Sequence, residues 1–280
     1  MEIRPKKALG QHFLRDGGTA LRIVKCLLPD DNLTFRERIP VVEVGPGTGV
    51  LTGILLDDPR VDYYAVELDR EAAALLRQKY PQIEERLKEG DFLKLPGTVF
   101  PPEFLLIGNF PYNISSQIFF RILELRNAIP QVVGMVQKEV AERFCARPGS
   151  RTYGILSVLL QTWYHTEYLF TVPPGAFVPP PKVNSGVIRL LRNERISLQC
   201  PEKLFLKVIK TTFNQRRKTI RNSLKPLLGD KKICSSGFPD LRPEQLGVEE
   251  FVQLTLEVEA VLNAGSSLLR DSYGQLAGRG

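Results

Sequence analysis

The tetrapeptide Asn109-Phe110-Pro111-Tyr112 carries residue types that are well suited to holding a flat polar ring. It follows the apolar run Phe104-Leu105-Leu106-Ile107-Gly108, which predicts a buried strand. A primary amide and a backbone carbonyl can accept hydrogens from an exocyclic amine, and the phenol ring can stack on the base that carries it. The same residues also suit an ordinary turn after a strand, because Asn and Pro are turn formers.

The length and composition of the chain indicate a globular protein of one large domain or two. It has 280 residues, of which 43% are hydrophobic and 25% charged, and its net charge of +7 is moderately basic. No apolar run approaches the roughly 18 to 20 residues that span a bilayer, and the N-terminus has no apolar core of a signal peptide. We therefore expect a cytoplasmic protein with no membrane partner.

The cysteines and histidines are too few and too scattered to predict a metal site or a disulfide framework. The chain contains no CxxC pair, and the residues concerned are Cys26, Cys145, Cys200, Cys234, His12 and His165. We expect no bound metal and reduced cysteines that serve as small core or surface residues.

A strand followed by a glycine-rich turn precedes the tetrapeptide by about 60 residues. The stretch Pro40–Thr52 runs from a β-branched strand through Gly45 and Gly47 into an apolar helix start. Glycines allow close approach of the backbone to a ligand, and the helix start offers free amide donors. Glu67 ends the next predicted strand about 20 residues after Gly45, where a carboxylate can accept both ribose hydroxyls of a nucleoside.

Strands and helices alternate along the chain up to the predicted strand Val132–Val136. This alternation predicts an α/β fold with a Rossmann-like, doubly wound parallel sheet. Ligands of such sheets bind beyond the carboxyl ends of the strands, where Gly45, Glu67, Asp91 and Asn109 all stand. Asp91 could bond an adenine amine or serve only as a turn residue.

After the sheet the pattern changes. A proline-rich loop over residues 170–185 carries Phe177, which on its own reads as a residue capping the core, and from about Arg195 the chain predicts helices only, over 204–213, 216–228 and 248–263. We place the domains at 1–195 and 196–280, the second a small helical domain with a loosely ordered tail. Cations gather around Arg216, either as a solvated helix face or as a surface that binds phosphate.

Six motifs, taken in order, resemble the ribosomal RNA adenine dimethyltransferase family over residues 6–254. They are Gly10-Gln11-His12-Phe13-Leu14, Glu43-Val44-Gly45-Pro46-Gly47, Glu67-Leu68-Asp69, Asn109-Phe110-Pro111-Tyr112-Asn113-Ile114-Ser115, Phe177-Val178-Pro179-Pro180-Pro181-Lys182-Val183 and Phe213-Asn214-Gln215-Arg216-Arg217-Lys218-Thr219. Each motif alone is weak, but the ordered set is specific. Two positions depart from the family, which usually has Asn at His12 and Leu at Phe110.

The resemblance implies S-adenosylmethionine as methyl donor and N6-dimethylation of two adjacent adenosines near the 3′ end of small-subunit ribosomal RNA. It also implies an immature 30S particle as partner and a monomeric enzyme. The implied cofactor residues are His12, Leu14, Gly45, Gly47, Glu67, Asp91 and Asn109. The implied catalytic residues are Asn109 and Pro111, whose side-chain oxygen and backbone carbonyl would accept the amine hydrogens, and Tyr112 and Phe177, which would stack on the base. The expected RNA contacts are Lys6, Lys7, Arg147, Arg151, Arg216, Arg217, Lys218 and Arg221.

Three other functions are alternatives to an RNA methyltransferase. A DNA adenine N6-methyltransferase would keep the fold and also end its motif in Pro-Tyr. A non-catalytic ribosome-assembly factor would use the basic helical domain. An NAD dehydrogenase is disfavoured, because the glycine spacing over Gly45–Gly49 is not that of the dinucleotide motif.

Overall fold

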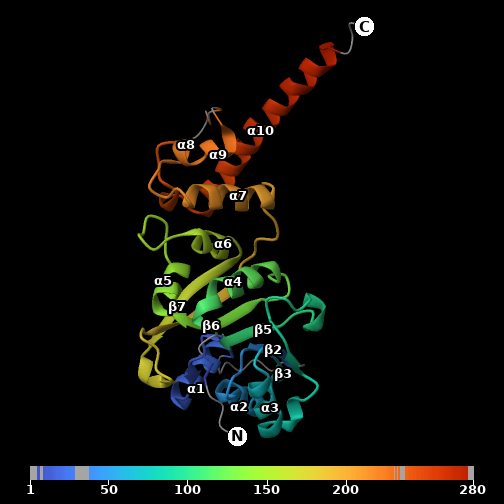
Figure 1. Cartoon of the computed structure of the whole chain (residues 1–280), viewed down its shortest axis with the longest axis vertical. Coiled ribbons are helices and arrows are strands. Elements are labelled where there is room, and N and C mark those ends of the chain that lie inside the picture. The colour runs from blue at the N-terminus through green and yellow to red at the C-terminus, as the bar shows by residue number, and fades with distance from the viewer. Residues whose placement is uncertain are drawn as a thin grey trace. The chain divides into compact units, whose positions relative to one another are not determined.

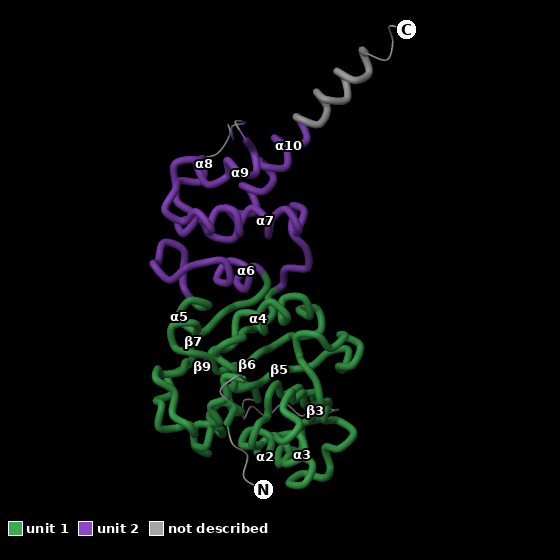
Figure 2. The backbone as a smooth tube through the Cα atoms, viewed as in Figure 1, with its two compact units in different colours: residues 1–145, 163–193 green, residues 146–162, 194–280 purple. Residues whose placement is uncertain are grey.

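The computed structural model describes residues 5–6, 9–28, 38–229, 231, 233 and 237–276, with side chains described up to residue 264. The chain divides into two compact units (Figure 2). Unit 1 comprises Met1–Cys145 and Trp163–Asn193, and unit 2 comprises Ala146–Thr162 and Glu194–Gly280. Unit 2 therefore includes residues 146–162, which the sequence analysis placed in the N-terminal domain.

Unit 1 is built on a seven-stranded sheet with the strand order β4-β3-β2-β5-β6-β9-β7 (Figure 1). The strands are β2 (Ile39–Val44), β3 (Val61–Glu67), β4 (Leu87–Glu89), β5 (Leu105–Asn109), β6 (Gln131–Gln137), β7 (Tyr164–Val172) and β9 (Ser185–Arg192). The five strands from β2 to β6 are parallel, as predicted. The sequence analysis assigned no strand to β7, and β9 runs antiparallel to both β6 and β7.

Helices cover both faces of this sheet, with one group on the lower side in Figure 1 and the other on the upper side. The lower group is α1 (Gly17–Leu27), α2 (Val50–Asp57) and α3 (Arg70–Lys79), and the upper group includes α4 (Ser115–Glu124) and α5 (Lys138–Phe144). Val41 and Ile107 belong to the same core cluster as Leu55 of α2. Their neighbours along the strands, Val42 and Leu106, are buried as well. Because side chains alternate along a strand, the central strands are buried on both faces and read as continuous apolar runs.

Short elements complete unit 1 around the ends of the strands. β1 (Phe13–Leu14) pairs with β8 (Phe177–Val178) in a separate antiparallel ladder that places Leu14 opposite Phe177. This pairing brings the N-terminal segment and the proline-rich segment side by side. The short 3-10 turns are η2 (Pro81–Ile83), η3 (Gly97–Val99), η4 (Tyr112–Ile114) and η5 (Pro174–Ala176).

Unit 2 is helical and packs around aromatic rings. Its elements are α6 (Ile155–Trp163, up to Thr162 in this unit), α7 (Glu202–Phe213), α8 (Ile220–Ser223), α9 (Lys225–Leu228), η6 (Pro243–Gln245) and α10 (Val248–Leu276). The ring of Phe213 lies 6.2 Å from that of Tyr153 and 5.8 Å from that of Phe251, centroid to centroid.

Two predicted boundaries in unit 2 were wrong. The helix expected over 216–228 begins only at Ile220, because Asn214–Arg217 form a turn that is closed by hydrogen bonds such as Lys218 N–H to the Gln215 carbonyl, and Leu224 divides it into the short helices α8 and α9. The last helix continues to Leu276 instead of ending at Asn263. No helix in the described part of the chain is long and apolar enough to cross a membrane.

Candidate active site

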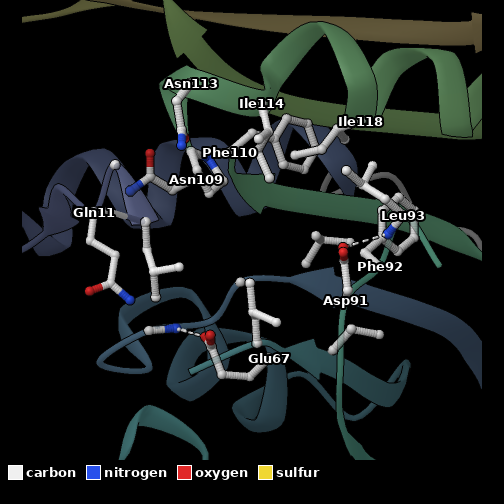
Figure 3. A pocket seen from close by; sticks show the side chains of 18 of the residues that line it. Gln11, Glu67, Asp91, Phe92, Leu93, Asn109, Phe110, Asn113, Ile114 and Ile118 are labelled. Carbon is white, nitrogen blue, oxygen red and sulfur yellow. Dashed lines mark hydrogen bonds between the residues drawn. The ribbon is translucent and has the colours of Figure 1, made fainter. Parts of the chain in front are cut away.

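A pocket of about 420 Å³ lies at the carboxyl ends of the parallel strands of unit 1 (Figure 3). Its lining comes from six segments, which are residues 9–13, 44–45 with 47, 66–68, 90–94, 109–114 and 117–118. Pockets of a few hundred cubic ångströms accommodate small-molecule ligands. The structure therefore brings together the strand-end residues that the sequence analysis selected.

The glycine turn and Glu67 form one side of the pocket. Gly45 and Gly47 have φ values of 69° and 57°, which residues other than glycine rarely adopt. The carboxylate of Glu67 accepts the backbone N–H of Gly47 at 2.9 Å and that of Asp69 at 2.8 Å, one on each oxygen. Each oxygen keeps a lone pair for a hydroxyl donor, so the residues fit the ribose of a nucleoside.

Burial sets the charge behaviour of Glu67. The residue is 5% exposed, and this burial raises the pKa of its carboxyl above the ordinary value, against the opposing effect of the backbone N–H groups of Asp69, Gly47 and Leu68. Only the ionised carboxylate can accept the two backbone N–H groups and two ribose hydroxyls at once. We therefore expect a bound ribose diol to favour the ionised form of Glu67.

Asp91 and a set of apolar residues form the opposite side of the pocket (Figure 3). Asp91 Oδ1 accepts the backbone N–H of Leu93 at 3.0 Å, so the residue both closes a turn and faces the pocket. The apolar lining here is Phe92, Leu93, Ile114 and Ile118. None of these four was predicted to line a site, although the four-residue spacing of Ile114 and Ile118 could have indicated those two. A flat heterocycle with an exocyclic amine fits between such residues and a carboxylate.

The side chain of Asn109 is oriented by a backbone carbonyl. Its Nδ2 donates to the carbonyl of His12 at 2.8 Å. Because only the amide nitrogen can donate to a carbonyl, this bond fixes which end of the amide is which. Oδ1 accepts no hydrogen bond from the residues that the structure describes. Since Asn109 lines the pocket, Oδ1 is an acceptor available to a ligand there.

The backbone acceptor predicted at Pro111 is already occupied. The Pro111 carbonyl accepts the hydroxyl of Ser115 at 3.0 Å and the backbone N–H of Ile114 at 3.3 Å, which uses both of its lone pairs. The neighbouring residue Phe110 also lines the pocket, and its carbonyl accepts no hydrogen bond within the described ranges. The occupied Pro111 carbonyl does not support its predicted role as the second acceptor, and the Phe110 carbonyl is the candidate in its place.

Of the two aromatic residues predicted to stack on a base, only Tyr112 lines the pocket. Its hydroxyl is hydrogen-bonded to the Ser185 hydroxyl, and burial raises the pKa of the phenol above its ordinary value. Phe177 is only 2% exposed and packs in the hydrophobic core, since its pairing with Leu14 places it inside. This position does not support the predicted stacking role of Phe177 and agrees with its core-capping alternative.

The two predicted cofactor residues of the N-terminal segment have different positions. His12 lines the pocket, and its imidazole stacks on Tyr112 with a centroid distance of 5.3 Å. Leu14 is 4% exposed and faces the core and a small hollow beside the glycine turn, not the main pocket. Any contact of Leu14 with a ligand in the main pocket would have to come from its backbone.

The aromatic residue at position 110 fits because two glycines flank it. Phe110 is buried and packs edge-on against Phe119, with ring centroids 5.7 Å apart. A Cβ atom on Gly134 would lie 2.3 Å from the Phe110 ring, and one on Gly108 would lie 2.6 Å from it. The missing Cβ atoms therefore leave the room that the larger ring needs.

We expect Gly134→Ala to lower the free energy of unfolding by about 1–3 kcal/mol, because its methyl group overlaps the Phe110 ring. In a Phe110→Leu background the same substitution should cost clearly less, since the smaller side chain vacates the space. Urea denaturation of the four proteins of this double-mutant cycle measures the difference. Equal costs in both backgrounds would contradict the packing account.

A buried carboxyl below the glycine turn makes stability depend on pH. Glu43 is 1% exposed, and its Oε2 accepts the hydroxyls of Thr52 at 2.8 Å and Tyr63 at 2.7 Å. Burial raises the pKa of Glu43 from 4.5 to about 7. The folded state therefore holds this proton more tightly than the unfolded state does. The contribution of Glu43 to stability is then full below pH 4.5 and is lost as the pH rises to about 7.

We expect this loss to amount to about 3 kcal/mol in the wild-type protein and to vanish in Glu43→Gln, whose neutral amide oxygen still accepts the two hydroxyls. The difference in the free energy of unfolding between the two proteins, measured at several values from about pH 5 to about pH 8, checks this. A difference that is constant with pH would show that Glu43 does not titrate in this range.

The basic N-terminal residues do not both fall within the described structure. Lys7 lies outside the described residues. Lys6 forms ion pairs from its Nζ to Asp69 at 2.7 Å and to Glu71 at 3.2 Å, and Gln11 Nε2 donates to the other oxygen of Asp69 at 3.1 Å. The charge of Lys6 is thus matched within the chain, and its position does not support the predicted phosphate contact.

Two basic segments that are distant in sequence lie together in unit 2. Arg216 Nη2 donates to the Ser150 carbonyl at 3.2 Å, which joins the loop of Arg147 and Arg151 to the turn of Arg217. Arg147, Arg151 and Arg217 are exposed and form no ion pair within the described structure, and we call them the basic surface. Of the other predicted contacts, Arg216 also approaches Glu244, Lys218 donates to Gln215, and Arg221 pairs with Asp240.

Comparisons with known proteins show which family the chain resembles. The sequence model of the family described as ribosomal RNA adenine dimethylase matches residues 3–242. The ribosomal RNA small subunit methyltransferase A of Parabacteroides distasonis is 55% identical over 257 residues, which cover 91% of this chain and 94% of the relative. The protein of the same name from Bacteroides thetaiotaomicron is 54% identical over 268 residues, covering 95% and 98%.

Two solved structures resemble the chain over most of its length. A dimethyladenosine transferase from Plasmodium falciparum superposes with a TM-score of 0.73 at 23% identity, covering 89% of this chain and 98% of that one. The 23S rRNA methyltransferase ErmE gives a TM-score of 0.60 at 26% identity, covering 88% and 99%. At 23% identity, the likeness to the Plasmodium falciparum protein is evidence of a shared fold only.

Proposed function

This chain belongs to the ribosomal RNA adenine dimethylase family and uses S-adenosylmethionine, and we propose that it dimethylates N6 of two adjacent adenosines near the 3′ end of small-subunit ribosomal RNA. The observation that carries the proposal is the Asn109 amide, anchored to the His12 carbonyl with its oxygen free at the pocket. The choice of the small subunit rests on the names of relatives that are more than 50% identical.

The chemical problem at adenine N6 is the weak nucleophilicity of its nitrogen, whose lone pair is delocalised into the ring. Asn109 Oδ1 and the Phe110 carbonyl accept the two amine hydrogens, which lets the nitrogen pyramidalise and present its lone pair. Bound S-adenosylmethionine supplies an electrophilic methyl group on a sulfonium. Holding the amine in line with that methyl lowers the barrier chiefly through orientation.

The neutral amide also suits a second methylation. After the first transfer the product ammonium is acidic and releases its proton without a strong general base. One hydrogen then remains on the amine, and a single acceptor is enough to orient it. Tyr112 provides an aromatic face for the base, a contact worth about 1–3 kcal/mol.

We assign RNA binding outside the pocket to the basic surface of Arg147, Arg151 and Arg217. Unpaired exposed cations neutralise phosphates and position the RNA, but they do not read its sequence. We further propose that the partner is an immature 30S particle, that the protein works in the cytoplasm, and that it acts as a monomer.

Transfer of labelled methyl groups from S-adenosylmethionine tests the substrate. Small-subunit particles that lack the modification should accept two methyl groups on each of two adenosines, and an excess of duplex DNA should not compete. Transfer to duplex DNA in place of the particles would support the DNA methyltransferase alternative. Binding of immature particles without any transfer would leave only the assembly-factor alternative.

A further inference from the structure

One residue of the N-terminal segment reaches both functional ends of the tetrapeptide Asn109–Tyr112. The backbone carbonyl of His12 accepts the Asn109 amide at 2.8 Å, and the imidazole of His12 stacks on the Tyr112 ring at 5.3 Å with an interplanar angle of 30°. The carbonyl contact does not depend on which side chain stands at position 12. The imidazole contact does.

The imidazole is itself held by the segment that follows β8, the partner strand of β1. Its Nδ1 lies 2.8 Å from the carbonyl oxygen of Pro179, which follows β8 directly. Because a carbonyl only accepts, Nδ1 must carry the hydrogen of this bond. The ring position is therefore fixed by one hydrogen bond and one stacking contact.

Tyr112 is correspondingly held at two points. Its hydroxyl bonds to Ser185, the buried first residue of β9, and its ring is covered by His12. Burial keeps the phenol protonated by raising its pKa. The tilt of the Tyr112 ring thus depends on the first residue of β9 at its hydroxyl and on the imidazole at its face.

We propose that the His12 imidazole is a positioning group that supports one face of Tyr112 and so sets the plane in which the other face receives the target adenine. The inference rests on the proposed function, because it concerns that base. A misplacement of about 1 Å in a pre-aligned reaction can lower the rate on the order of 10²-fold, so even a small change in ring tilt should be measurable.

Two substitutions separate the contacts of the imidazole. His12→Asn keeps a donor at the δ position for the Pro179 carbonyl but removes the ring, whereas His12→Phe keeps the ring and removes the donor. Both leave the backbone carbonyl that orients Asn109. The exposed His165 on β7 provides matched controls as His165→Asn and His165→Phe.

Single-turnover methyl transfer to small-subunit particles lacking the modification is the measurement, together with the affinity for S-adenosylhomocysteine by calorimetry. We expect His12→Asn to slow transfer about ten-fold while the cofactor affinity and the apparent affinity for the particles stay nearly unchanged. His12→Phe should retain most of the wild-type rate, and the His165 variants should transfer methyl groups at the wild-type rate.

Two results would overturn the inference while leaving the proposed function standing. An unchanged rate in His12→Asn would show that the ring does not matter. A faster rate in His12→Asn, with tighter binding of the particles, would show that the imidazole occupies the place of the target base. Failure of the wild-type protein to transfer methyl groups would instead refute the proposed function.

Discussion

Asn109→Ala should lower the rate of methyl transfer on the order of 10²–10³-fold while leaving cofactor binding almost intact. The substitution removes Oδ1, the side-chain acceptor that the His12 carbonyl holds in position at the pocket. Without it the target nitrogen keeps its lone pair in the ring and loses its alignment. Single-turnover transfer to unmodified small-subunit particles and calorimetry with S-adenosylhomocysteine measure the two effects separately.

Asn109→Asp is the matched control for this prediction. It preserves shape and an acceptor, but it places a carboxylate oxygen against the His12 carbonyl where Nδ2 now donates. Two acceptors repel each other, so we expect the carboxylate to turn away and the rate to fall as in Asn109→Ala. A fully active aspartate variant would show that the orientation of the amide is not what matters.

Glu67→Ala should weaken the binding of S-adenosylhomocysteine on the order of 10²–10³-fold, since it removes a carboxylate suited to accept two ribose hydroxyls, and hydrogen bonds to charged groups contribute about 1.5–3 kcal/mol each. It also frees the N–H groups of Gly47 and Asp69, which loosens the glycine turn. Calorimetric titration measures the affinity. A loss below about three-fold, that is below about 0.7 kcal/mol, would contradict the assignment.

The pH dependence of cofactor binding gives an independent check on Glu67. Because burial raises the pKa of its carboxyl, the group takes up a proton at a higher pH than an exposed glutamate does. Protonation removes acceptor capacity, so affinity should decrease as the pH falls through this raised value. The Asp91→Asn variant should keep the same pH trend, whereas Glu67→Ala should lose it.

The cofactor half of the pocket was predictable from the sequence because it depends on local order. Glycines after β2 and an acidic residue at the end of β3 have fixed places in a parallel sheet, whatever the rest of the chain does. Asn109 at the end of β5 follows from the same rule. The parallel direction of the strands from β2 to β6 was therefore accessible from the sequence.

The errors concern contacts between distant segments. Phe177 is buried because β8 pairs with β1, more than 160 residues away, and neither two-residue strand has a pattern of its own. The ion pair of Lys6 with Asp69 and the bond of His12 with Pro179 are of the same kind. The missed strand β7 alternates only partly between exposed and buried residues and carries an irregularity between Tyr168 and Phe170.

The assignment of residues 146–162 depended on tertiary packing in the same way. An apolar helix such as α6 reads alike in either unit, and Tyr153 belongs with Phe213 and Phe251 only once the helices of unit 2 have assembled. The Pro111 carbonyl is occupied for a more local reason, which is that the Ser115 hydroxyl donates back to it.

The central claim is that this pocket methylates N6 of two adjacent adenosines in small-subunit ribosomal RNA. Mass-spectrometric mapping of that RNA tests it most directly, in cells deleted for the gene and in deleted cells supplied with the wild-type protein or the Asn109→Ala variant. We predict that the two N6,N6-dimethyladenosines disappear on deletion and return only with the wild-type protein. Their persistence in the deleted cells, or their return with the Asn109→Ala variant, would contradict the account.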